Sequence, residues 1–370
     1  MSSPHLDTLI GAPKSEIDTP ALLIDLDIME ANIRKMADFF KSVNADLRPH
    51  AKTHKTPIIA HKQIEAGAIG ITCAKLGEAE ALVHAGIRDV LIANQIIGAA
   101  KIARLVNLAG HSEIMVAVDD PYNVAQLSEA AEAKGVTLRI LIEVDTGMNR
   151  CGTEPGKPTL DLARLVLKSK GLQFEGLMGY EGHTVAIPSF TERKKQTDES
   201  VDLLVETKDV LERNGVPVKI MSGGGTGTYA ITGAHPDMTE IQAGSYIFMD
   251  STYGDVEGIG DRFASSLTVL TAVVSRPNPS RVVVDAGLKV LAKEFGIPQP
   301  AGIAGLEMIG LSEEHGKMTA QGDVNLQPGD KIEIVPTHCC TTVNLHNRYY
   351  ALRNDTVESI WEITARGRSQ

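Results

Sequence analysis

The sequence of 370 residues has few cysteines and no long apolar run. Its four cysteines, Cys73, Cys151, Cys339 and Cys340, show no C-x-x-C spacing. A disulfide framework is therefore not expected, and a reducing, cytoplasmic location is favoured. No stretch approaches about 18 uninterrupted apolar residues, so no membrane span is predicted. The N-terminal MSSPHLDTLIGAPKSEIDTP lacks a basic segment followed by an apolar one, so we predict no signal peptide.

Basic residues are fewer than acidic residues in this chain. The chain has 36 lysines and arginines against 47 acidic residues, for a formal net charge of -11. A nucleic-acid backbone or an anionic membrane surface requires a basic face, so neither is expected as a partner. Small anionic substrates stay possible, because one arginine or a few backbone N–H groups can bind them locally. With 43% hydrophobic and 22% charged residues, the composition is that of a globular protein.

Short apolar runs alternate with helical patterns through the first two thirds of the chain. Runs such as LRILIEVD and DVLIAN are nearly continuous, as is typical of strands buried on both faces. The predicted strands are Asp46–Lys52, Gly70–Lys75, Asp89–Asn94, Glu113–Asp119, Leu138–Asp145, Phe174–Tyr180, Val218–Ser222 and Thr239–Ala243. This alternation predicts an α/β fold with a (β/α)8 TIM-type barrel, and a doubly wound sheet is the alternative.

The pattern changes after about residue 263. The runs SLTVLTAVVSRP, RVVVDAGLK, KIEIVPTH, RYYALRN and VESIWEI are rich in β-branched residues and separated by turns. They predict a C-terminal antiparallel β domain, which the early run ALLIDLD joins or connects to the barrel. We therefore predict a barrel over residues 28–262 and a β domain over 1–27 and 263–370.

The first candidate site is RPHAKTHK, at the end of the first predicted strand. In a barrel the loops after the strands form the active face. Lys52 would lie there, close to His50 and His54, where desolvation lowers the pKa of a lysine and suits it to Schiff-base chemistry. The alternative is a basic surface loop.

A second candidate, SGGGTGT at residues 222–228, follows the seventh strand. Glycines let backbone N–H groups approach an anion, and barrels often bind phosphate after strands 7 and 8. The segment QAGSY, from Gln242 to Tyr246, follows the eighth strand and would complete the cradle. A flexible turn is the alternative.

Two further segments carry polar residues suited to ligands. Arg150, in DTGMNRCG after the fifth strand, could bind a carboxylate, although a loop ion pair is the simpler interpretation. His338 and Cys340, in HCC, would face the same way along an extended stretch, with Cys339 pointing elsewhere. They could hold a metal in an open, catalytic style of site. The alternative is a histidine beside two buried thiols.

Together these segments resemble one family. The motifs RPHAKTHK, EVDTGMNRCG, SGGGTGT, EIQAGSYIFMD, VVDAGLK, EEHG and PTHCCTTVNLH occur in this order in D-threonine aldolases and, more distantly, in D-serine dehydratases. Both groups are fold-type III, alanine racemase-like enzymes dependent on pyridoxal 5'-phosphate. The resemblance runs over nearly the whole chain, from TPA at residue 19 to WEI at residue 361.

The resemblance implies roles for individual residues. Lys52 would bind the cofactor covalently, and Arg150 would meet its phenolic oxygen or the substrate carboxylate. His338 and Cys340 would bind a divalent metal. Gln242 occupies the position near the pyridine nitrogen where alanine racemases have an arginine. The remaining expected cofactor contacts, most of them to the phosphate, are His50, Tyr180, Gly224, Gly225, Thr226, Gly244, Ser245 and Tyr246.

Two departures from the family pattern bear on function. The aldolases compared have His-x-Asp where this chain has His338-Cys339-Cys340, and His-x-Cys is the dehydratase pattern. A thiolate favours zinc, whereas a carboxylate favours manganese or magnesium. The aldolases also tend to have Tyr-His-Gly after the sixth strand, where this chain has YEGH, so His183 is the candidate for the displaced histidine and for a base.

The leading functional prediction is retro-aldol cleavage of a D-3-hydroxy amino acid to glycine and an aldehyde. The main alternative is a dehydratase that gives a 2-oxo acid and ammonia. A cofactor carrier without catalysis and a racemase are further alternatives, although a carrier needs no metal and a racemase wants a second base. The resemblance also implies a homodimer.

Overall fold

The computed structural model describes residues 7–370, and the chain forms two compact units. The barrel unit comprises Lys35–Lys52, Pro57–Gly244 and Gly367–Gln370. The β unit comprises Thr53–Thr56, Ser245–Arg366 and the described part of Met1–Arg34. Residues 1–6, which belong to the stretch searched for a signal peptide and to the predicted domain 1–27, lie outside the described residues. The predicted domain boundaries at 28 and 262 stay predictions.

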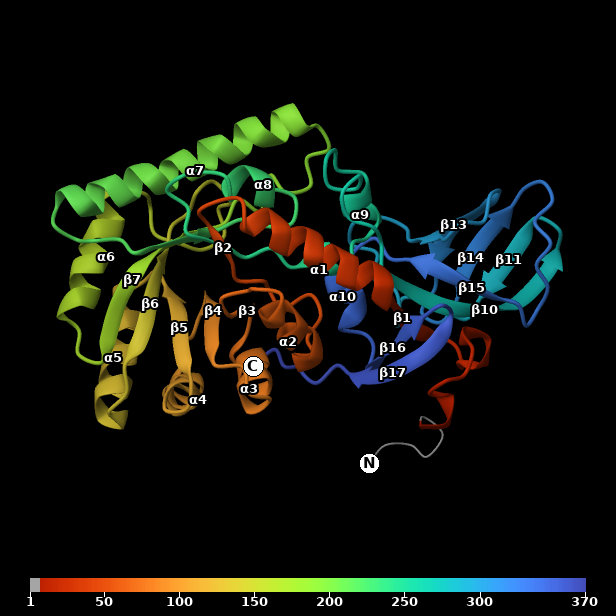
Figure 1. Ribbon diagram of the computed structural model, residues 1–370, viewed down its shortest axis with the longest axis horizontal. Helices are drawn as coiled ribbons and strands as arrows, with labels where there is room; N and C mark the ends of the chain where they lie inside the picture. The colour runs from red at the N-terminus through yellow and green to blue at the C-terminus, as the bar shows by residue number, and fades with distance from the viewer. Residues whose placement is uncertain (1–6) are drawn as a thin grey trace. The chain divides into compact units, whose positions relative to one another are not determined.

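Eight parallel strands form a single sheet in the described residues of the barrel unit, in the order β2-β9-β8-β7-β6-β5-β4-β3 (Figure 1). They are β2 (Asp46–Leu47), β3 (Ile71–Cys73), β4 (Asp89–Gln95), β5 (Glu113–Val118), β6 (Leu138–Glu143), β7 (Leu172–Gly179), β8 (Ile220–Gly223) and β9 (Glu240–Ile241). Each corresponds to one of the eight predicted runs, and most are shorter than predicted.

A bridge just beyond β2 joins the two ends of this sheet. His50 pairs in parallel with Thr72 of β3. The Thr72 backbone N–H donates to the Pro49 carbonyl at 2.9 Å, and the Ala51 N–H donates to the Thr72 carbonyl at 2.8 Å. The sheet therefore closes on itself, which confirms the barrel prediction over the doubly wound alternative.

Helices follow the strands and flank them within the barrel unit (Figure 1). They are α2 (Pro57–Glu65), α3 (Leu76–His84), α4 (Ala99–Ala109), α5 (Pro121–Lys134), α6 (Lys157–Lys168), α7 (Phe190–Arg213) and α8 (Tyr229–Thr232). Sequence signals set their ends: Asp120 accepts hydrogen bonds from the first turn of α5, and Gly135, with φ of 71°, ends that helix. The division between the two units falls within α1 (Leu26–Phe40). No helix among residues 7–370 is long and apolar enough to span a membrane.

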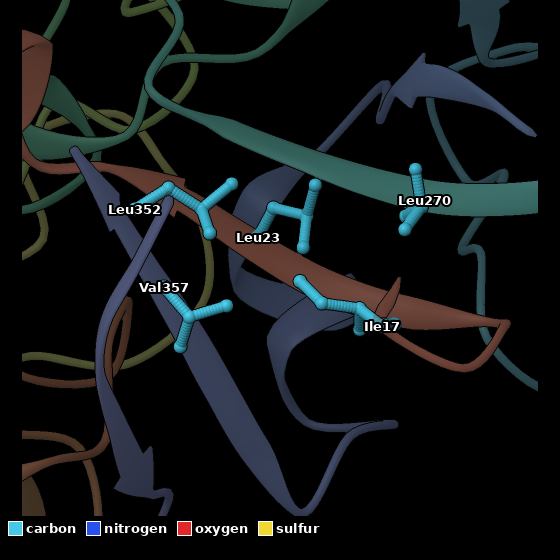
Figure 2. Packing of buried hydrophobic residues seen from close by; sticks show 6 residues of the cluster. Ile17, Leu23, Leu270, Leu352 and Val357 are labelled. Atoms are coloured by element: carbon cyan, nitrogen blue, oxygen red, sulfur yellow. The ribbon is translucent and has the colours of Figure 1, made fainter. Parts of the chain in front are cut away.

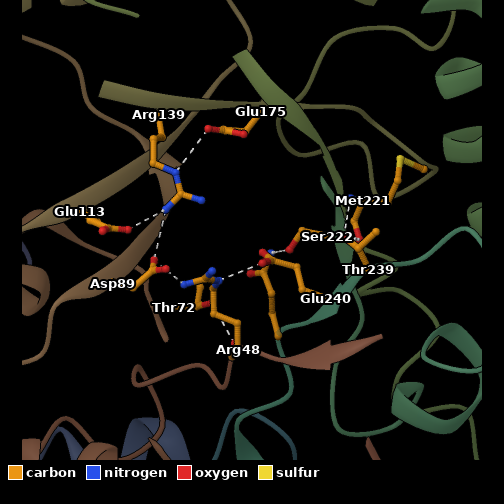
Figure 3. Close-up of polar contacts among 11 residues, drawn as sticks. Arg48, Thr72, Asp89, Glu113, Arg139, Glu175, Met221, Ser222, Thr239 and Glu240 are labelled. Atoms are coloured by element: carbon orange, nitrogen blue, oxygen red, sulfur yellow. Dashed lines mark hydrogen bonds and ion pairs between the residues drawn. The ribbon is translucent and has the colours of Figure 1, made fainter. Parts of the chain in front are cut away.

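The barrel interior combines apolar packing with a buried charge network. Its apolar cluster consists of Leu91, Met115, Ala117, Leu141 and Met178, all buried. In the network, Arg48 is 2% exposed and pairs with Glu240 at 2.9 Å and with Asp89 at 2.7 Å (Figure 3). Arg139 adds Glu175 at 3.5 Å. Asp89 and Glu240 are the first residues of β4 and β9, so the network lies at the amino ends of these strands. The opposite, carboxyl ends of the strands form the active face of a barrel.

Nine strands form one sheet in the described part of the β unit. They are β1 (Ala21–Asp25), β10 (Leu267–Asn278), β11 (Arg281–Val284), β12 (Gln299–Pro300), β13 (Leu306–Leu311), β14 (Gly316–Ala320), β15 (Lys331–Val335), β16 (Arg348–Arg353) and β17 (Thr356–Glu362). The main order is β13-β14-β11-β10-β1-β16-β17, with β15 between β10 and β12. All pairs are antiparallel except β1 with β16, so the predicted antiparallel domain is confirmed with one parallel pair.

A hydrophobic cluster holds the centre of this sheet together (Figure 2). Ile17, Leu23, Leu270, Leu352 and Val357 pack against one another and are each at most 7% exposed. They come from β1, β10, β16 and β17 and from the segment before β1. This unit also contains the short helices η1 (Asp7–Leu9), η2 (Lys14–Glu16), η3 (Ser245–Ile247), α9 (Ser251–Gly254) and α10 (Cys339–Val343).

Candidate active site

Lys52 lies in the loop that follows β2, where the barrel prediction places a reactive group. Its side chain is half-buried, and its Nζ is 5.6 Å from the centre of the Tyr180 ring. The Lys52 backbone N–H donates to Nδ1 of His50 at 3.4 Å, so the buried His50 ring turns back on the loop. The lysine amine is thus held over an aromatic ring at the carboxyl end of the strands.

Arg150 shares the same aromatic ring. Its guanidinium carbon is 5.7 Å from the Tyr180 centre, and Nη2 is 3.7 Å from Oε1 of Glu143. The loop before it is fixed by Asp145, whose Oδ1 accepts from the backbone N–H groups of Gly147 and Asn149, both at 3.0 Å. The structure therefore brings together three of the predicted residues, Lys52, Tyr180 and Arg150.

The glycine turn from Ser222 to Thr228 is closely packed. Gly224 has φ of 75°, and a Cβ there would lie 2.8 Å from the Ile241 side chain. A Cβ at Gly227 would lie 1.7 Å from the Val185 carbonyl, so only glycine fits. The N–H of Gly225 donates to the Thr228 hydroxyl at 3.0 Å. The predicted phosphate contacts of Gly224, Gly225 and Thr226 stay a prediction.

Glu181 is a site residue that sequence reasoning missed. It is 1% exposed, and its Oε2 accepts from the Gly224 N–H at 3.2 Å while Oε1 accepts from the Thr232 hydroxyl. Glu181 therefore connects the backbone of the glycine turn to Thr232, the last residue of α8. A signal was available, because Glu181 directly follows the end of the sixth predicted strand, yet His183 drew attention instead.

His183 lies in an open pocket on the barrel unit. Its Nε2 is 3.5 Å from the Ser200 hydroxyl of α7, and its ring faces Gly147. The pocket has a volume of about 350 Å³ and is lined by Thr146, Gly147, His183, Glu192, Lys195, Gln196, Glu199, Ser200 and Leu203. The base role of His183 stays a prediction.

The remaining predicted phosphate and ring contacts fall in both units. Gln242 is half-buried, and its side-chain amide donates to the Ser222 hydroxyl at 2.8 Å, within the barrel unit. Gly244 is the last residue of that segment of the barrel unit. Ser245 and Tyr246 belong to the β unit, where they begin η3 and are buried. The Tyr246 ring packs against Phe263 at 5.9 Å between centres.

The β unit carries the predicted metal donors. His338 caps α10, which begins at Cys339, so the expectation of an extended stretch is wrong from Cys339 onward. One donor atom each of His338, Cys339 and Cys340 lie within 4.8 Å of one another. The Cys339 sulfur therefore does not point away as expected. Consecutive side chains of a helix are about 100° apart around its axis, whereas those of a strand point to opposite faces. The Cys340 Sγ lies 3.3 Å from the Thr53 hydroxyl.

Asp250, which sequence reasoning did not single out, orients the histidine. It is fully buried, and its Oδ2 is 3.0 Å from His338 Nδ1 and accepts from the Cys339 backbone N–H at 3.0 Å. A carboxylate only accepts, so Nδ1 carries the proton and Nε2 is left for a metal. Burial lowers the pKa of His338, but interactions with Cys340 and Asp250 outweigh it and raise that pKa to about 10, so metal binding must displace a proton from Nε2.

We expect Asp250→Asn to weaken zinc binding about 10- to 100-fold, since outer carboxylates hold a metal-binding histidine in its ring orientation and tautomer. Competition with a chromophoric chelator measures the dissociation constant. Asp255→Asn is the matched control, because Asp255 is exposed at the other end of α9. Equal affinities of wild type and Asp250→Asn would contradict the orienting role.

The residues present fit the two groups that the sequence motifs imply. In the barrel unit, an amine and a guanidinium over one aromatic ring, beside a turn in which only glycine fits, suit an anionic aromatic aldehyde. In the β unit, an imidazole nitrogen and thiol sulfurs backed by a buried carboxylate suit a borderline-soft divalent ion.

Comparison with known proteins gives the same assignment. The family model described as "Alanine racemase, N-terminal domain" matches residues 24–252, and "Putative serine dehydratase domain" matches residues 266–352. A 3-hydroxy-D-aspartate aldolase of Paracoccus denitrificans is 38% identical, covering 98% of this chain and 96% of its own. A D-threonine aldolase of Arthrobacter is 39% identical, covering 97% and 96%.

A solved structure extends the likeness to three dimensions. The D-threonine aldolase from Filomicrobium marinum has a TM-score of 0.95 and 41% identity, covering 97% of this chain and 98% of that one. Dehydratases are more distant: a D-threo-3-hydroxyaspartate dehydratase of Delftia is 27% identical, covering 94% of this chain and 97% of its own. The aldolases are carbon–carbon lyases, and their alanine racemase-like family implies pyridoxal phosphate. The chain therefore belongs to the alanine racemase-like family, among the relatives of D-threonine aldolase and 3-hydroxy-D-aspartate aldolase.

Proposed function

We propose that the protein cleaves D-3-hydroxy amino acids by a retro-aldol reaction that depends on pyridoxal phosphate and a divalent metal. The observation that carries the proposal is the pair of cations, Lys52 and Arg150, over the Tyr180 ring, in a chain that is 38% and 39% identical to two aldolases and 27% identical to a dehydratase. D-threonine and D-3-hydroxyaspartate, the substrates in those relatives' names, are the compounds to try first.

Each residue has a definite task in this proposal. The Lys52 amine would hold the cofactor covalently until the amine of the substrate takes its place. The Arg150 guanidinium holds a carboxylate through paired N–H groups, which orients the bond to be broken. The glycine turn, whose Gly224 N–H donates to Glu181, would hold the phosphate through its other backbone N–H groups. Bound there, the cofactor supplies an electron sink for the bonding electrons released at the α-carbon.

The metal and the base complete the reaction. His338 and Cys340 would hold the ion, whose chemistry is to lower the pKa of a hydroxyl that it binds. His183 is the proposed base for the proton of that hydroxyl. As the Cα–Cβ bond breaks, the oxygen forms a double bond to C3 in the departing aldehyde. The α-carbon then gains a proton, which gives glycine.

A dehydratase is the second candidate, favoured by one observation. Cys340 stands where the compared aldolases have an aspartate, so the donor pair is the dehydratase one. A D-threo-3-hydroxyaspartate dehydratase has been solved with a substitution in a metal-free form, which supports a metal in that relative. In that reaction Lys52 would remove the α-proton, the hydroxyl would leave from C3, and the products would be a 2-oxo acid and ammonia.

A product assay decides between the two. The purified protein, with pyridoxal phosphate and either manganese or zinc, is incubated with D-threonine or D-3-hydroxyaspartate. We expect glycine and aldehyde in equal amounts, no reaction with L-threonine, and loss of turnover on chelation while pyridoxal phosphate stays bound. Ammonia and a 2-oxo acid would establish the dehydratase instead. Full activity after thorough chelation would remove the metal from the reaction.

We further propose that the protein is a cytoplasmic homodimer that binds neither nucleic acid nor membranes. The family resemblance and the net charge of -11 support this. Size-exclusion chromatography with light scattering measures the assembly directly, and a monomeric mass with full activity would contradict the dimer.

A further inference from the structure

Glu143 is a buried carboxylate that the proposed reaction does not use. It ends β6 and is 5% exposed. Its Oε2 accepts from the Gln95 side-chain amide at 2.6 Å, and its Oε1 is 3.7 Å from Nη2 of Arg150. The guanidinium side chain is 50% exposed, so the carboxylate is the fixed member of this pair.

The support behind Glu143 comes from two neighbouring strands. The register of β4 with β5 shifts between Ile92 and Gln95, and such irregularities re-aim side chains near strand ends. The Gln95 amide donates to Asp119 Oδ2 at 3.0 Å as well as to Glu143. Asp119 in turn accepts from the Gly152 backbone N–H at 2.9 Å, in the loop that carries Arg150. Gln95 and Asp119 therefore connect the Glu143 carboxylate to the end of the loop that carries Arg150.

A metal ion is the alternative explanation for this cluster, because donor atoms of Asp119, Glu143 and Cys151 lie within 4.8 Å of one another. Both carboxylates, however, already accept from the Gln95 amide, and Asp119 accepts a second hydrogen bond from Gly152. The other Glu143 oxygen, Oε1, faces the cationic Arg150 guanidinium at 3.7 Å, and that positive charge would repel a metal ion there. The arrangement is that of a scaffold for the guanidinium.

We propose that Glu143, held by Gln95, is a positioning residue for Arg150. It anchors one N–H edge of the guanidinium over the Tyr180 ring and leaves the other edge for the anionic cofactor or the substrate carboxylate. This inference rests on the proposed function, in which Arg150 binds that anion. It adds that the affinity of Arg150 for its ligand depends on the Glu143 carboxylate, which does not itself contact the ligand.

The sign of the effect separates positioning from simple electrostatics. Removing a negative charge near a site for anions would by itself tighten the binding of an anion. Releasing the guanidinium would instead weaken binding, because an exposed arginine with no anchor loses more freedom when it binds. Glu143→Gln keeps the size of the side chain and an acceptor for Gln95, so it removes the anchor of Arg150 alone.

The experiment is a double-mutant cycle with Glu143→Gln, Arg150→Leu and the combined variant. Absorbance titration gives the dissociation constant of pyridoxal phosphate for each protein, a readout that needs no turnover. We expect Glu143→Gln to raise this constant, and the KM for D-threonine, about three- to tenfold, with a smaller change in kcat. In the Arg150→Leu background Glu143→Gln should change the dissociation constant no further, since it acts through that arginine.

Glu175→Gln is the matched control, because Glu175 is also a buried carboxylate paired with an arginine, but at the charge network of Figure 3. It should leave the cofactor constant unchanged. Tighter or unchanged binding in Glu143→Gln, or equal effects with and without Arg150, would overturn the inference. If Glu143→Gln does not fold, Gln95→Met tests the same anchor. Absence of glycine from the wild type would overturn the proposed function, whereas the binding cycle still decides the role of Glu143.

Discussion

Lys52→Ala is expected to abolish the visible absorption of bound pyridoxal phosphate and to lower glycine formation on the order of 10³-fold or more. The reason is geometric: the amine is half-buried over the Tyr180 ring, beside Arg150, at the end of the first barrel strand. An alanine would leave the proposed phosphate contacts in place but would remove the covalent partner of the cofactor. Absorbance spectra and a coupled glycine assay measure the two effects.

Lys55→Ala is the matched control for this experiment. Lys55 lies three residues later in the same basic segment, but it belongs to the β unit and its backbone has φ of 53°. It should keep both the absorption and the activity. Borohydride reduction followed by peptide mass spectrometry locates the modified lysine directly. Retained absorption in Lys52→Ala, or the reduced cofactor found on Lys55, would contradict the assignment of Lys52 as the lysine that binds the cofactor.

Much of the barrel was predictable because its strands are buried on both faces. The run of residues 138–143, LRILIE, is apolar at four of its six positions, and the structure has β6 there. Strand ends were less predictable. The run 46–52 was expected to be one strand, yet β2 stops at Leu47, where Pro49 follows closely and lacks a backbone N–H. The chain still pairs at His50, so the closure survives the interruption.

The cluster of Lys52, Tyr180 and Arg150 could be anticipated for the same reason. All three follow barrel strands, and the carboxyl ends of parallel strands meet at one face. The residues behind them could not be anticipated. Glu181 holds Gly224 from 43 residues away, and Gln95 reaches Glu143 from 48 residues away. Such tertiary partners leave no periodicity or local motif in a single sequence.

The metal donors show how a long-range contact overrides a local expectation. An extended stretch was expected through Cys340, as a continuation of the β-branched run KIEIVPTH. Instead the buried Asp250 carboxylate, 88 residues before His338 in the chain, accepts the N–H of Cys339, the first residue of α10. A carboxylate at the first turn satisfies an amide that the helix itself leaves unpaired. The helix then brings the Cys339 sulfur near the other donors.

Replacing Cys340 by aspartate is expected to change the metal that supports turnover. A thiolate favours zinc, whereas a carboxylate favours manganese or magnesium, so Cys340→Asp should bind zinc more weakly and should be most active with manganese. Cys340→Ala, which supplies no donor, should lose metal-dependent turnover on the order of 10²-fold or more with every ion. Metal titrations and the glycine assay, run with each ion after chelation, measure both.

The variant Cys339→Ser tests whether the Cys339 sulfur binds the metal in addition to the Cys340 sulfur. The Cys339 side chain is fully buried, and burial raises the pKa of its thiol well above the usual value, which opposes the thiolate that a metal needs. We therefore expect Cys339→Ser to keep zinc binding, while Cys340→Ala loses it. Equal losses in the two variants would make Cys339 a third donor, and the site would then be a histidine with two thiolates. If Cys340→Asp instead gave glycine while the wild type gave ammonia, the single donor atom at position 340 would select between carbon–carbon and carbon–oxygen cleavage on an otherwise unchanged scaffold.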